Sequence, residues 1–260
     1  MLVEMINKSM KVLVTGSSGY IGSVLLPYLR GKGLECLGYD TGFFKDCLLY
    51  DLPKTETTWR DVRDFNDNDF KNIDAVVHLA GISNDPLKKM DAANVYDPVR
   101  AYSFDIAEIC KKKRIKFIFA SSCSVYGVGS DELLTEASLT NPQTGYSLNK
   151  LQIEEDLRSI SDKSFSPIAL RFATAYGASP RIRFDVVVNM LTGMAVTEGR
   201  IVLNSDGTPW RPNVHVFDFC EAIRRAIELD YSGEELLVLN VGDESNNLQV
   251  IQIAKIIQNA

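Results

Sequence analysis

A tyrosine and a lysine four positions apart form the first candidate for catalysis in this 260-residue sequence. They are Tyr146 and Lys150, in a stretch whose pattern predicts a helix to about Ile160. Side chains at i and i+4 leave one face of a helix. A tyrosine base needs its pKa lowered from about 10 toward about 7, which costs about 4 kcal/mol. An ammonium group about 4 Å away, at an effective dielectric constant of about 20, supplies about that much. The pair could therefore take a proton from a hydroxyl group, although a surface Tyr and Lys share this spacing by chance.

A run of small polar side chains after an apolar strand is the second candidate. Phe117–Ala120 reads as a strand, and Ser121, Ser122, Cys123 and Ser124 follow it without a break. A strand that stops in such a cluster could simply be turning, or it could present a hydroxyl group to a ligand. These residues alone leave both possibilities open.

The sequence Gly16-Ser-Ser-Gly19-Tyr-Ile-Gly22 directly follows the first predicted strand and opens the first predicted helix. In that context it is typical of a dinucleotide-binding turn. Gly16 permits the tight turn, Gly19 lets a pyrophosphate approach the backbone, and Gly22 lets helix and strand pack closely. The N–H groups and dipole at the helix N-terminus would bind the phosphates. The alternative is that these three glycines serve only the turn of the chain and bind no dinucleotide. The predicted cofactor-binding residues of this turn are Gly16, Ser18, Gly19, Tyr20, Ile21 and Gly22.

An acidic residue ends the second predicted strand. Asp40 stands 18 residues after Gly22, where a carboxylate can accept both ribose hydroxyls of a dinucleotide. It would repel the extra phosphate of NADP, and no arginine follows at once to receive one. The sequence therefore favours NAD, unless Asp40 is only a loop carboxylate.

Two further strand ends extend the predicted cofactor site. Asp61 and Val62 follow the third strand and could hold the adenine edge. Leu79, Ala80 and Gly81 end the fourth strand, and their small side chains would let the cofactor lie across the sheet.

The elements that must position these residues alternate along the chain. Continuously apolar strands indicate a sheet covered on both faces, which is typical of a parallel sheet in a Rossmann-type doubly wound α/β fold. After about residue 177 the segments become shorter and mixed. We predict an NAD-binding domain at 1–177 and a smaller substrate-binding lobe at 178–260, interleaved with the Rossmann sheet. The predicted strands are Lys11–Thr15, Leu34–Tyr39, Ala75–Leu79, Phe117–Ala120 and Ile168–Phe172, and the first predicted helix covers Tyr20–Arg30.

Composition excludes several classes of function. A net charge of −6 argues against nucleic acid as the partner. Five scattered cysteines without a CxxC pair, together with only two histidines, favour a reducing cytoplasm and no metal site. Of those histidines, His78 is more typical of a packed structural residue. The sequence shows no targeting segment and no apolar run long enough to span a membrane.

Together these motifs resemble the extended short-chain dehydrogenase/reductase superfamily, in particular its NAD-dependent nucleotide-sugar epimerase/dehydratase branch, in the manner of the UDP-glucose 4-epimerases. The resemblance runs from Met10 to about Asn246, through TGSSGYIG, the terminal Asp40, HLAG, SSCSVYG, YSLNK and WRPNVHVFD. It implies that Ser122 is the catalytic hydroxyl, that Tyr146 takes the proton while NAD takes the hydride, and that Lys150 also holds the nicotinamide ribose.

The resemblance also implies a substrate and an assembly. The substrate would be a nucleotide-diphosphate sugar, bound by residues that include Ser124, Asn189 and Arg211. A homodimer would form through the Tyr146–Ile160 helix and the helix ending near Lys113, with apolar contacts from Leu148, Leu151 and Leu157. Family members usually run several dozen residues further, so we expect the substrate lobe to be incomplete.

The SSCSVYG motif narrows the reaction. Family 4,6-dehydratases carry an Asp-Glu pair where this chain has Cys123 and Ser124, and neither is a competent acid at neutral pH without help. What remains is chemistry that needs only a hydride and one proton. A 4-epimerase is the first hypothesis, and a reductase or dehydrogenase of the same branch is the second. A non-catalytic dinucleotide-binding regulator is the third, disfavoured because such relatives tend to lose the Tyr-Lys pair.

Overall fold

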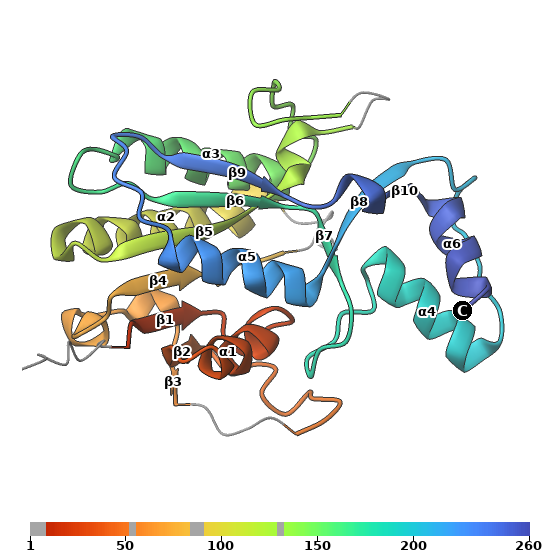
Figure 1. Cartoon of the computed structure of the whole chain (residues 1–260), viewed down its shortest axis with the longest axis horizontal. Helices are drawn as coiled ribbons and strands as arrows, with labels where there is room; N and C mark the ends of the chain where they lie inside the picture. Colours follow the sequence, from red (N-terminus) through yellow and green to blue (C-terminus); the bar gives the residue numbers. More distant parts are fainter. Residues whose placement is uncertain (1–8, 52–55, 84–90, 129–132) are drawn as a thin grey trace, which may run out of the picture.

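The computed structural model describes residues 9–51, 56–83, 91–128 and 133–260 (Figure 1). Its largest feature is a seven-stranded sheet in the order β3-β2-β1-β4-β5-β6-β9, with every neighbouring pair parallel. The predicted Rossmann-type doubly wound fold is therefore confirmed. The strands are β1 (Lys11–Thr15), β2 (Glu35–Asp40), β3 (Thr57–Trp59), β4 (Ala75–His78), β5 (Lys116–Ser122), β6 (Ile168–Phe172) and β9 (Leu237–Val241).

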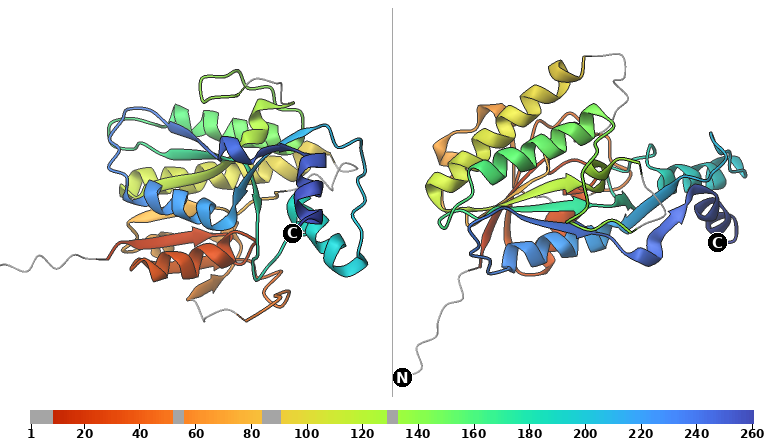
Figure 2. Two further views of the ribbon diagram at one scale, coloured as in Figure 1. Left: turned by 45° about the vertical axis from the view of Figure 1, so that its right-hand side comes forward. Right: turned by 90° about the horizontal axis from the view of Figure 1, so that it is seen from above.

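Helices cover both faces of this sheet, as the view from above shows (Figure 2). Helices α1 (Gly22–Gly31) and α5 (Val216–Glu228) pack on one face, and α2 (Ala92–Lys113) and α3 (Gly145–Ser159) pack on the other. The central strand β4 is consequently buried along its whole length, which explains why its sequence does not alternate between apolar and polar residues. No helix in the described part of the chain combines the length and the apolar character needed to cross a membrane.

A smaller lobe lies beyond the carboxyl ends of the strands, on the right of Figure 1. It contains a three-stranded sheet in the order β10-β8-β7. Leu191, Ile253 and Ala254 form a core of their own between its two helices. The elements of the lobe are β7 (Thr174–Tyr176), α4 (Val187–Glu198), β8 (Trp210–His215), β10 (Asn247–Gln249) and α6 (Val250–Gln258).

Between β8 and β10 the chain returns to the Rossmann layers. Helix α5 packs against α1, and β9 pairs with β6 at the edge of the large sheet. Residues 216–241 therefore belong to the Rossmann part of the molecule in space, although they follow the predicted boundary at residue 177.

Several predicted boundaries move by one or two residues. Helix α1 begins at Gly22 rather than Tyr20 and continues through Pro27. Strand β5 extends to Ser122, because its backbone still pairs with β6 through Ser122↔Phe172. The apolar pattern ends at Ala120, but backbone pairing does not require apolar side chains, so the strand is longer than the pattern. Four short 3₁₀ helices complete the described elements: η1 (Val62–Asp64), η2 (Asp67–Phe70), η3 (Cys123–Tyr126) and η4 (Glu244–Asn246).

One apolar residue predicted at a dimer contact is used inside the chain. Leu157 is 0% exposed in the core between α3 and the sheet, so it is unavailable to a partner. The prediction was wrong because Leu157 lies on the side of α3 that packs against the sheet. Leu148, on another face, is 46% exposed.

Candidate active site

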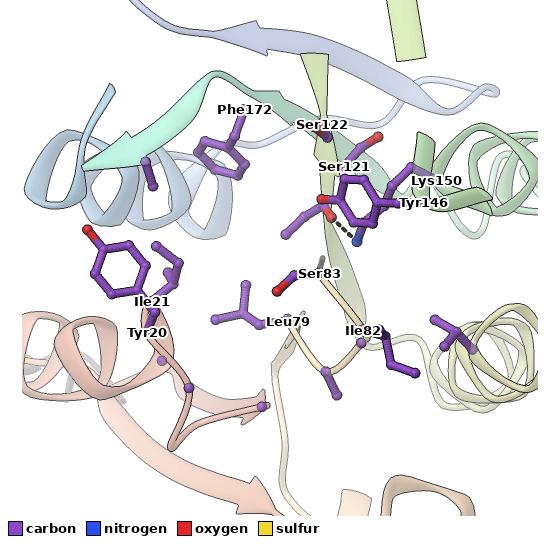
Figure 3. Close-up of a pocket in the computed structure, with 18 of the residues that line it drawn as sticks. Tyr20, Ile21, Leu79, Ile82, Ser83, Ser121, Ser122, Tyr146, Lys150 and Phe172 are labelled. Atoms are coloured by element: carbon purple, nitrogen blue, oxygen red, sulfur yellow. Dashed lines mark hydrogen bonds between the residues drawn. The ribbon is translucent and has the colours of Figure 1, made fainter. Parts of the chain in front are cut away.

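A cavity of about 870 Å³ lies at the carboxyl ends of β1, β2, β4, β5 and β6 (Figure 3). Parallel strands end at the same edge of a sheet, so loops that are distant in sequence meet there. The volume lies within the range of pockets for cofactors and other small ligands. Figure 3 shows Tyr20 and Ile21 of the glycine-rich turn across the cavity from Ser121, Ser122, Tyr146 and Lys150.

The glycine-rich turn requires glycine at two positions. Gly16 has φ +69°, and a Cβ there would lie 2.8 Å from the backbone nitrogen of Ala80. A Cβ on Gly22 would lie 2.3 Å from the carbonyl oxygen of Gly16. Close packing thus explains both residues, and both also line the cavity together with Gly19, Tyr20 and Ile21. Helix α1 begins at Gly22, on the cavity wall, so the positive end of its dipole lies at this point, although the N–H groups of Ser23, Val24 and Leu25 already donate to the carbonyl oxygens of Gly19 and Ile21.

A backbone-to-side-chain hydrogen bond joins Ser18 to Asp40. The backbone N–H of Ser18 donates to Oδ2 of Asp40 at 2.9 Å, and that of Gly42 donates to Oδ1 at 2.8 Å. Asp40 lines the cavity, and each carboxylate oxygen keeps a lone pair for a further donor such as a ribose hydroxyl. Ser18 is not part of the cavity wall; its N–H fixes Asp40, so its contribution to a cofactor site is indirect.

Asp61 and Val62 also line the cavity, but the Asp61 carboxylate already has a partner. Its two oxygens accept from the Arg63 guanidinium at 2.9 and 2.7 Å. These bonds hold the pKa of Asp61 below its usual value. The carboxylate is therefore only partly available, and the side chain of Val62 forms the neighbouring apolar wall.

The middle of the cavity is lined by Leu79, Ala80 and Gly81, and His78 is buried next to them at the end of β4. The Ala80 N–H donates to Oγ1 of Thr15 at 3.1 Å, and that hydroxyl shares a 2.9 Å hydrogen bond with Nδ1 of His78. Burial lowers the pKa of His78 to about 3, with the Lys150 charge contributing further. His78 is thus neutral at physiological pH and holds a strand end in place, as the sequence indicated.

Tyr146 and Lys150 both reach the cavity from α3. Nζ of Lys150 donates to the carbonyl oxygen of Ala120 at 2.7 Å and lies 5.7 Å from the centre of the Tyr146 ring. It also lies 4.6 Å from the centre of the Phe119 ring. Burial lowers the pKa of Lys150 to about 8, against an opposing effect of the Glu154 carboxylate. An ammonium group beside a tyrosine in a buried wall favours the phenolate form of that tyrosine.

Ser122 answers the question that its sequence neighbourhood leaves open. Its Oγ accepts the N–H of Ser124 at 3.2 Å, so it caps η3 and begins a turn. It also lines the cavity on the same side as Tyr146. The strand end therefore does both: it turns, and it presents a hydroxyl group.

The two residues after Ser122 differ in their surroundings. Burial raises the pKa of the Cys123 thiol to about 11, so the thiol is protonated at neutral pH. Oγ of Ser124 is buried on the cavity wall and has no hydrogen-bond partner among the residues that the structure describes. A buried hydroxyl without a partner is costly, so a polar ligand group is the expected partner at this position.

Arg183 is a cavity residue that the sequence reasoning missed. Its guanidinium donates to the side-chain and backbone oxygens of Ser83 at 2.9 and 3.4 Å and pairs with Asp185 at 2.6 Å. It thereby joins the chain leading into α4 to the loop after β4, and both Arg183 and Ser83 line the cavity. The only sequence signal was an arginine in a polar segment before a helix, which is too common to identify a site.

Two predicted substrate residues lie away from the wall. The Asn189 amide is used within the protein: Oδ1 accepts from the Gly177 N–H at 3.0 Å, and Nδ2 donates to Tyr20 and to the Arg183 carbonyl. Asn189 therefore fastens the lobe to the glycine-rich turn rather than facing a ligand. Arg211 is exposed on β8, with Nη1 bonded to the Trp210 carbonyl at 2.8 Å; it does not line the cavity, although its charge acts on the thiol of Cys123, which does.

The residues present fit a dinucleotide. One half of the cavity carries three features of a dinucleotide site. They are the glycines of the turn, where a Cβ would meet the backbone, the N-terminus of α1, and the acidic Asp40 at the end of β2. Among the described residues, no group of three or more His, Cys, Asp or Glu side chains is arranged to hold a metal ion.

Comparison with known proteins gives a family match over most of the chain. The profile of the NAD dependent epimerase/dehydratase family matches residues 12–242. The UDP-glucose 4-epimerase of Bacillus subtilis is 29% identical over 94% of this chain and 80% of its own length.

Solved structures agree with this match. MoeE5, solved in complex with UDP-glucuronic acid and NAD, is 28% identical with a TM-score of 0.80, over 96% of this chain and 81% of its own. The UDP-glucuronic acid 4-epimerase of Bacillus cereus, solved with UDP-glucuronic acid and NAD, is 24% identical with a TM-score of 0.80, over 96% and 82%. At that identity the latter shows the shared fold alone.

Proposed function

The chain belongs to the NAD dependent epimerase/dehydratase family, and from this premise we propose that it is an NAD-dependent nucleotide-sugar 4-epimerase. One observation carries the proposal: Ser122, Tyr146 and Lys150 meet on one side of a cavity whose other side carries the glycine-rich turn. A hydroxyl, a base and an ammonium group thus face the place where a dinucleotide would end.

NAD, when bound, supplies a hydride acceptor that can return the hydride to the same carbon. The chain's own residues handle the proton. Tyr146 takes the proton of the sugar hydroxyl as that carbon is oxidised, and it gives the proton back when the resulting ketone is reduced. Lys150, whose charge favours the phenolate, makes this transfer possible near neutral pH.

Ser122 orients the reacting hydroxyl. Its Oγ is fixed at the end of β5 by the Ser124 N–H, so it is held before the substrate arrives. Ser124, whose buried Oγ has no partner in the described part of the chain, is a second polar group for the sugar.

The residues after Ser122 favour epimerisation over dehydration. Elimination of water needs an acid and a base beyond the hydride step, and a thiol with a pKa raised to about 11 is a poor acid. An epimerase instead returns the hydride to the other face of the sugar carbon, so its substrate must turn within the cavity. No additional acid is needed for that.

The proposed substrate is a nucleotide-diphosphate sugar. The Bacillus subtilis relative is a UDP-glucose 4-epimerase, and MoeE5 was solved with UDP-glucose as well as with UDP-glucuronic acid. The sugar would lie beside Ser122 and Tyr146, with the nucleotide toward the smaller lobe. Arg183, which precedes α4 of that lobe and lines the cavity, is a candidate for its diphosphate.

The test is to incubate the purified protein and NAD with UDP-glucose, UDP-glucuronic acid and UDP-N-acetylglucosamine, and to separate the products by chromatography. We expect conversion of at least one to its 4-epimer, with no net change in the absorbance of reduced nicotinamide. Stoichiometric oxidation or reduction would instead identify a dehydrogenase or reductase, and loss of water a dehydratase.

We also propose a cytoplasmic homodimer. The five cysteines all lie in described segments and are free thiols, which supports a reducing compartment. Leu148 on α3 is 46% exposed and Leu151 is half-buried, so both remain candidate apolar contacts. Light scattering at micromolar concentration should give twice the chain mass, and a monomer would contradict this assembly.

A further inference from the structure

An ion pair is buried directly behind the proposed active site. The Arg171 guanidinium lies 2.6 Å from the Glu154 carboxylate, and the two side chains are 5% and 0% exposed. Removing two charges from water is costly, so such a pair contributes little net stability compared with an apolar pair. Its place in the fold therefore needs another explanation.

The pair belongs to a row of polar residues across three neighbouring strands. Ser121 of β5 stands opposite Arg171 of β6, and Arg171 stands opposite Asn240 of β9. Glu154 reaches this row from α3: it accepts from the Ser121 hydroxyl at 2.5 Å and from Nε of Arg171 at 3.0 Å. Nη1 of Arg171 donates to the Tyr126 hydroxyl at 2.9 Å, and that hydroxyl donates to Asn240 at 2.6 Å.

Each contact of the row adjoins a residue of the site. Ser121 precedes Ser122 in β5, and Tyr126 is the last residue of η3, which Ser122 caps. Both ends of the Ser122–Tyr126 segment are thus attached to the same guanidinium–carboxylate pair. Glu154, on the other side, lies one turn after Lys150 and two turns after Tyr146 in α3.

We propose that Glu154 is a positioning residue, which holds the strand end bearing Ser122 in register with the helix bearing Tyr146 and Lys150. This inference rests on the proposed function, because it assigns those three residues to one reaction. Without Glu154, strand and helix would still pack through the apolar core, but no polar contact of this row would fix their relative position.

The Glu154 charge has a second effect on the site. Lys150 is faced by the Ala120 carbonyl and the Phe119 ring of β5, the neutral His78 of β4, and Tyr146 and Glu154 of its own helix. Burial lowers the pKa of Lys150, and the negative charge of the Glu154 carboxylate opposes this change. Removal of that charge should let Lys150 lose its proton at lower pH.

The test compares Glu154→Gln with Asp156→Asn in the NAD-bound protein. Asp156 lies on the same helix and pairs with Arg100 of α2 at 2.6 Å, away from the row. We expect Glu154→Gln to lower kcat about tenfold or more while KM changes less than about threefold, since a misplaced base slows chemistry more than binding. Asp156→Asn should leave kcat and its pH dependence unchanged.

A readout that needs no substrate separates this proposal from the proposed function. In protein labelled with ¹³Cε-lysine, Lys150 is assigned by comparison with Lys150→Arg, and its resonance is followed against pH. We expect a midpoint of about 8 in the unchanged protein and a midpoint lower by about 0.5 or more in Glu154→Gln. If no nucleotide sugar is converted but the midpoint moves, the proposed function is wrong, and the positioning role of Glu154 is rejected with it. The electrostatic effect of Glu154 on Lys150 is then still confirmed.

Glu154→Gln leaves the Arg171 charge buried without its partner, so that variant could fail to fold. The double variant Glu154→Gln/Arg171→Gln removes both charges and should show a similar fall in kcat. Its Lys150 midpoint should lie below that of the unchanged protein but above that of Glu154→Gln, because the positive charge of Arg171 is removed too. An unchanged kcat in a folded variant would overturn the proposal. So would a fall in kcat matched by Asp156→Asn, or one without movement of the Lys150 midpoint.

Discussion

Nζ of Lys150 donates a 2.7 Å hydrogen bond to the carbonyl oxygen of Ala120. This contact joins α3 to β5 two residues before Ser122, so the half-buried lysine is fixed in direction. Its charge consequently acts at a defined place beside Tyr146.

The Lys150 contact predicts an alkaline limit to activity. An ordinary lysine keeps its proton to about pH 10.5, but burial lowers the pKa of Lys150 to about 8. The charged form is therefore lost as pH rises through about 8, and kcat/KM should fall above that value. Rates measured from about pH 6 to 10 check this, and a profile that is flat to the alkaline end would exclude a role for the ammonium group.

Tyr146→Phe should retain NAD binding and lose most turnover. The substitution removes the proton acceptor and leaves the glycine-rich turn untouched. Lys150→Ala should damage both, because one ammonium group would serve the tyrosine and the nicotinamide ribose. Calorimetric titration with NAD, alongside turnover, separates the two variants. Near-normal turnover of Tyr146→Phe would contradict the catalytic assignment.

Asp40 should make NAD bind at least about tenfold more tightly than NADP, about 1.4 kcal/mol, through carboxylate–phosphate repulsion. Asp40→Asn keeps an oxygen for one backbone donor and removes the charge, so it should narrow this ratio. Calorimetric titration of both cofactors against both proteins measures the change. Equal or tighter NADP binding by the unchanged protein would contradict the assignment.

Ser122→Ala and Cys123→Ala should differ in their effect on turnover. Ser122→Ala loses the hydrogen bond that orients the reacting hydroxyl and should cost about 10²-fold or more. Cys123→Ala should cost less than about tenfold, because a protonated thiol transfers no proton in an epimerisation. The reverse order, with reduced cofactor accumulating in Cys123→Ala, would show that the thiol acts as an acid.

Many residues that line the cavity of the candidate site could be predicted because they stand in short motifs. The turn from Gly16 to Gly22, the acidic Asp40 and the spacing of Tyr146 and Lys150 all depend on neighbours within one strand–helix unit. The positions of these residues on one cavity follow from the rule that parallel strands end at a common edge. Local sequence and a general topological rule were sufficient for them.

The residues that were missed or misplaced depend on contacts between distant segments. Arg183 reaches the cavity by bridging 100 positions to Ser83, and nothing near it in the sequence marks that contact. Asn189 has the polarity of a ligand-binding residue, but Gly177, Tyr20 and Arg183 take up its amide. Leu157 has the character of a surface leucine on a dimer helix, yet the direction of α3 places it in the core. Only the assembled fold decides such cases.

The return of the chain through α5 and β9 has a consequence for unfolding. Three covalent crossings link the lobe to the Rossmann layers: β6 to β7, β8 to α5, and β9 to β10. Cutting the chain at residue 177 would therefore not release a domain; it would strip an edge strand from the sheet and uncover the apolar face that α1 shares with α5. The two halves should lose structure as one cooperative unit, so that no protease-resistant fragment corresponds to either half.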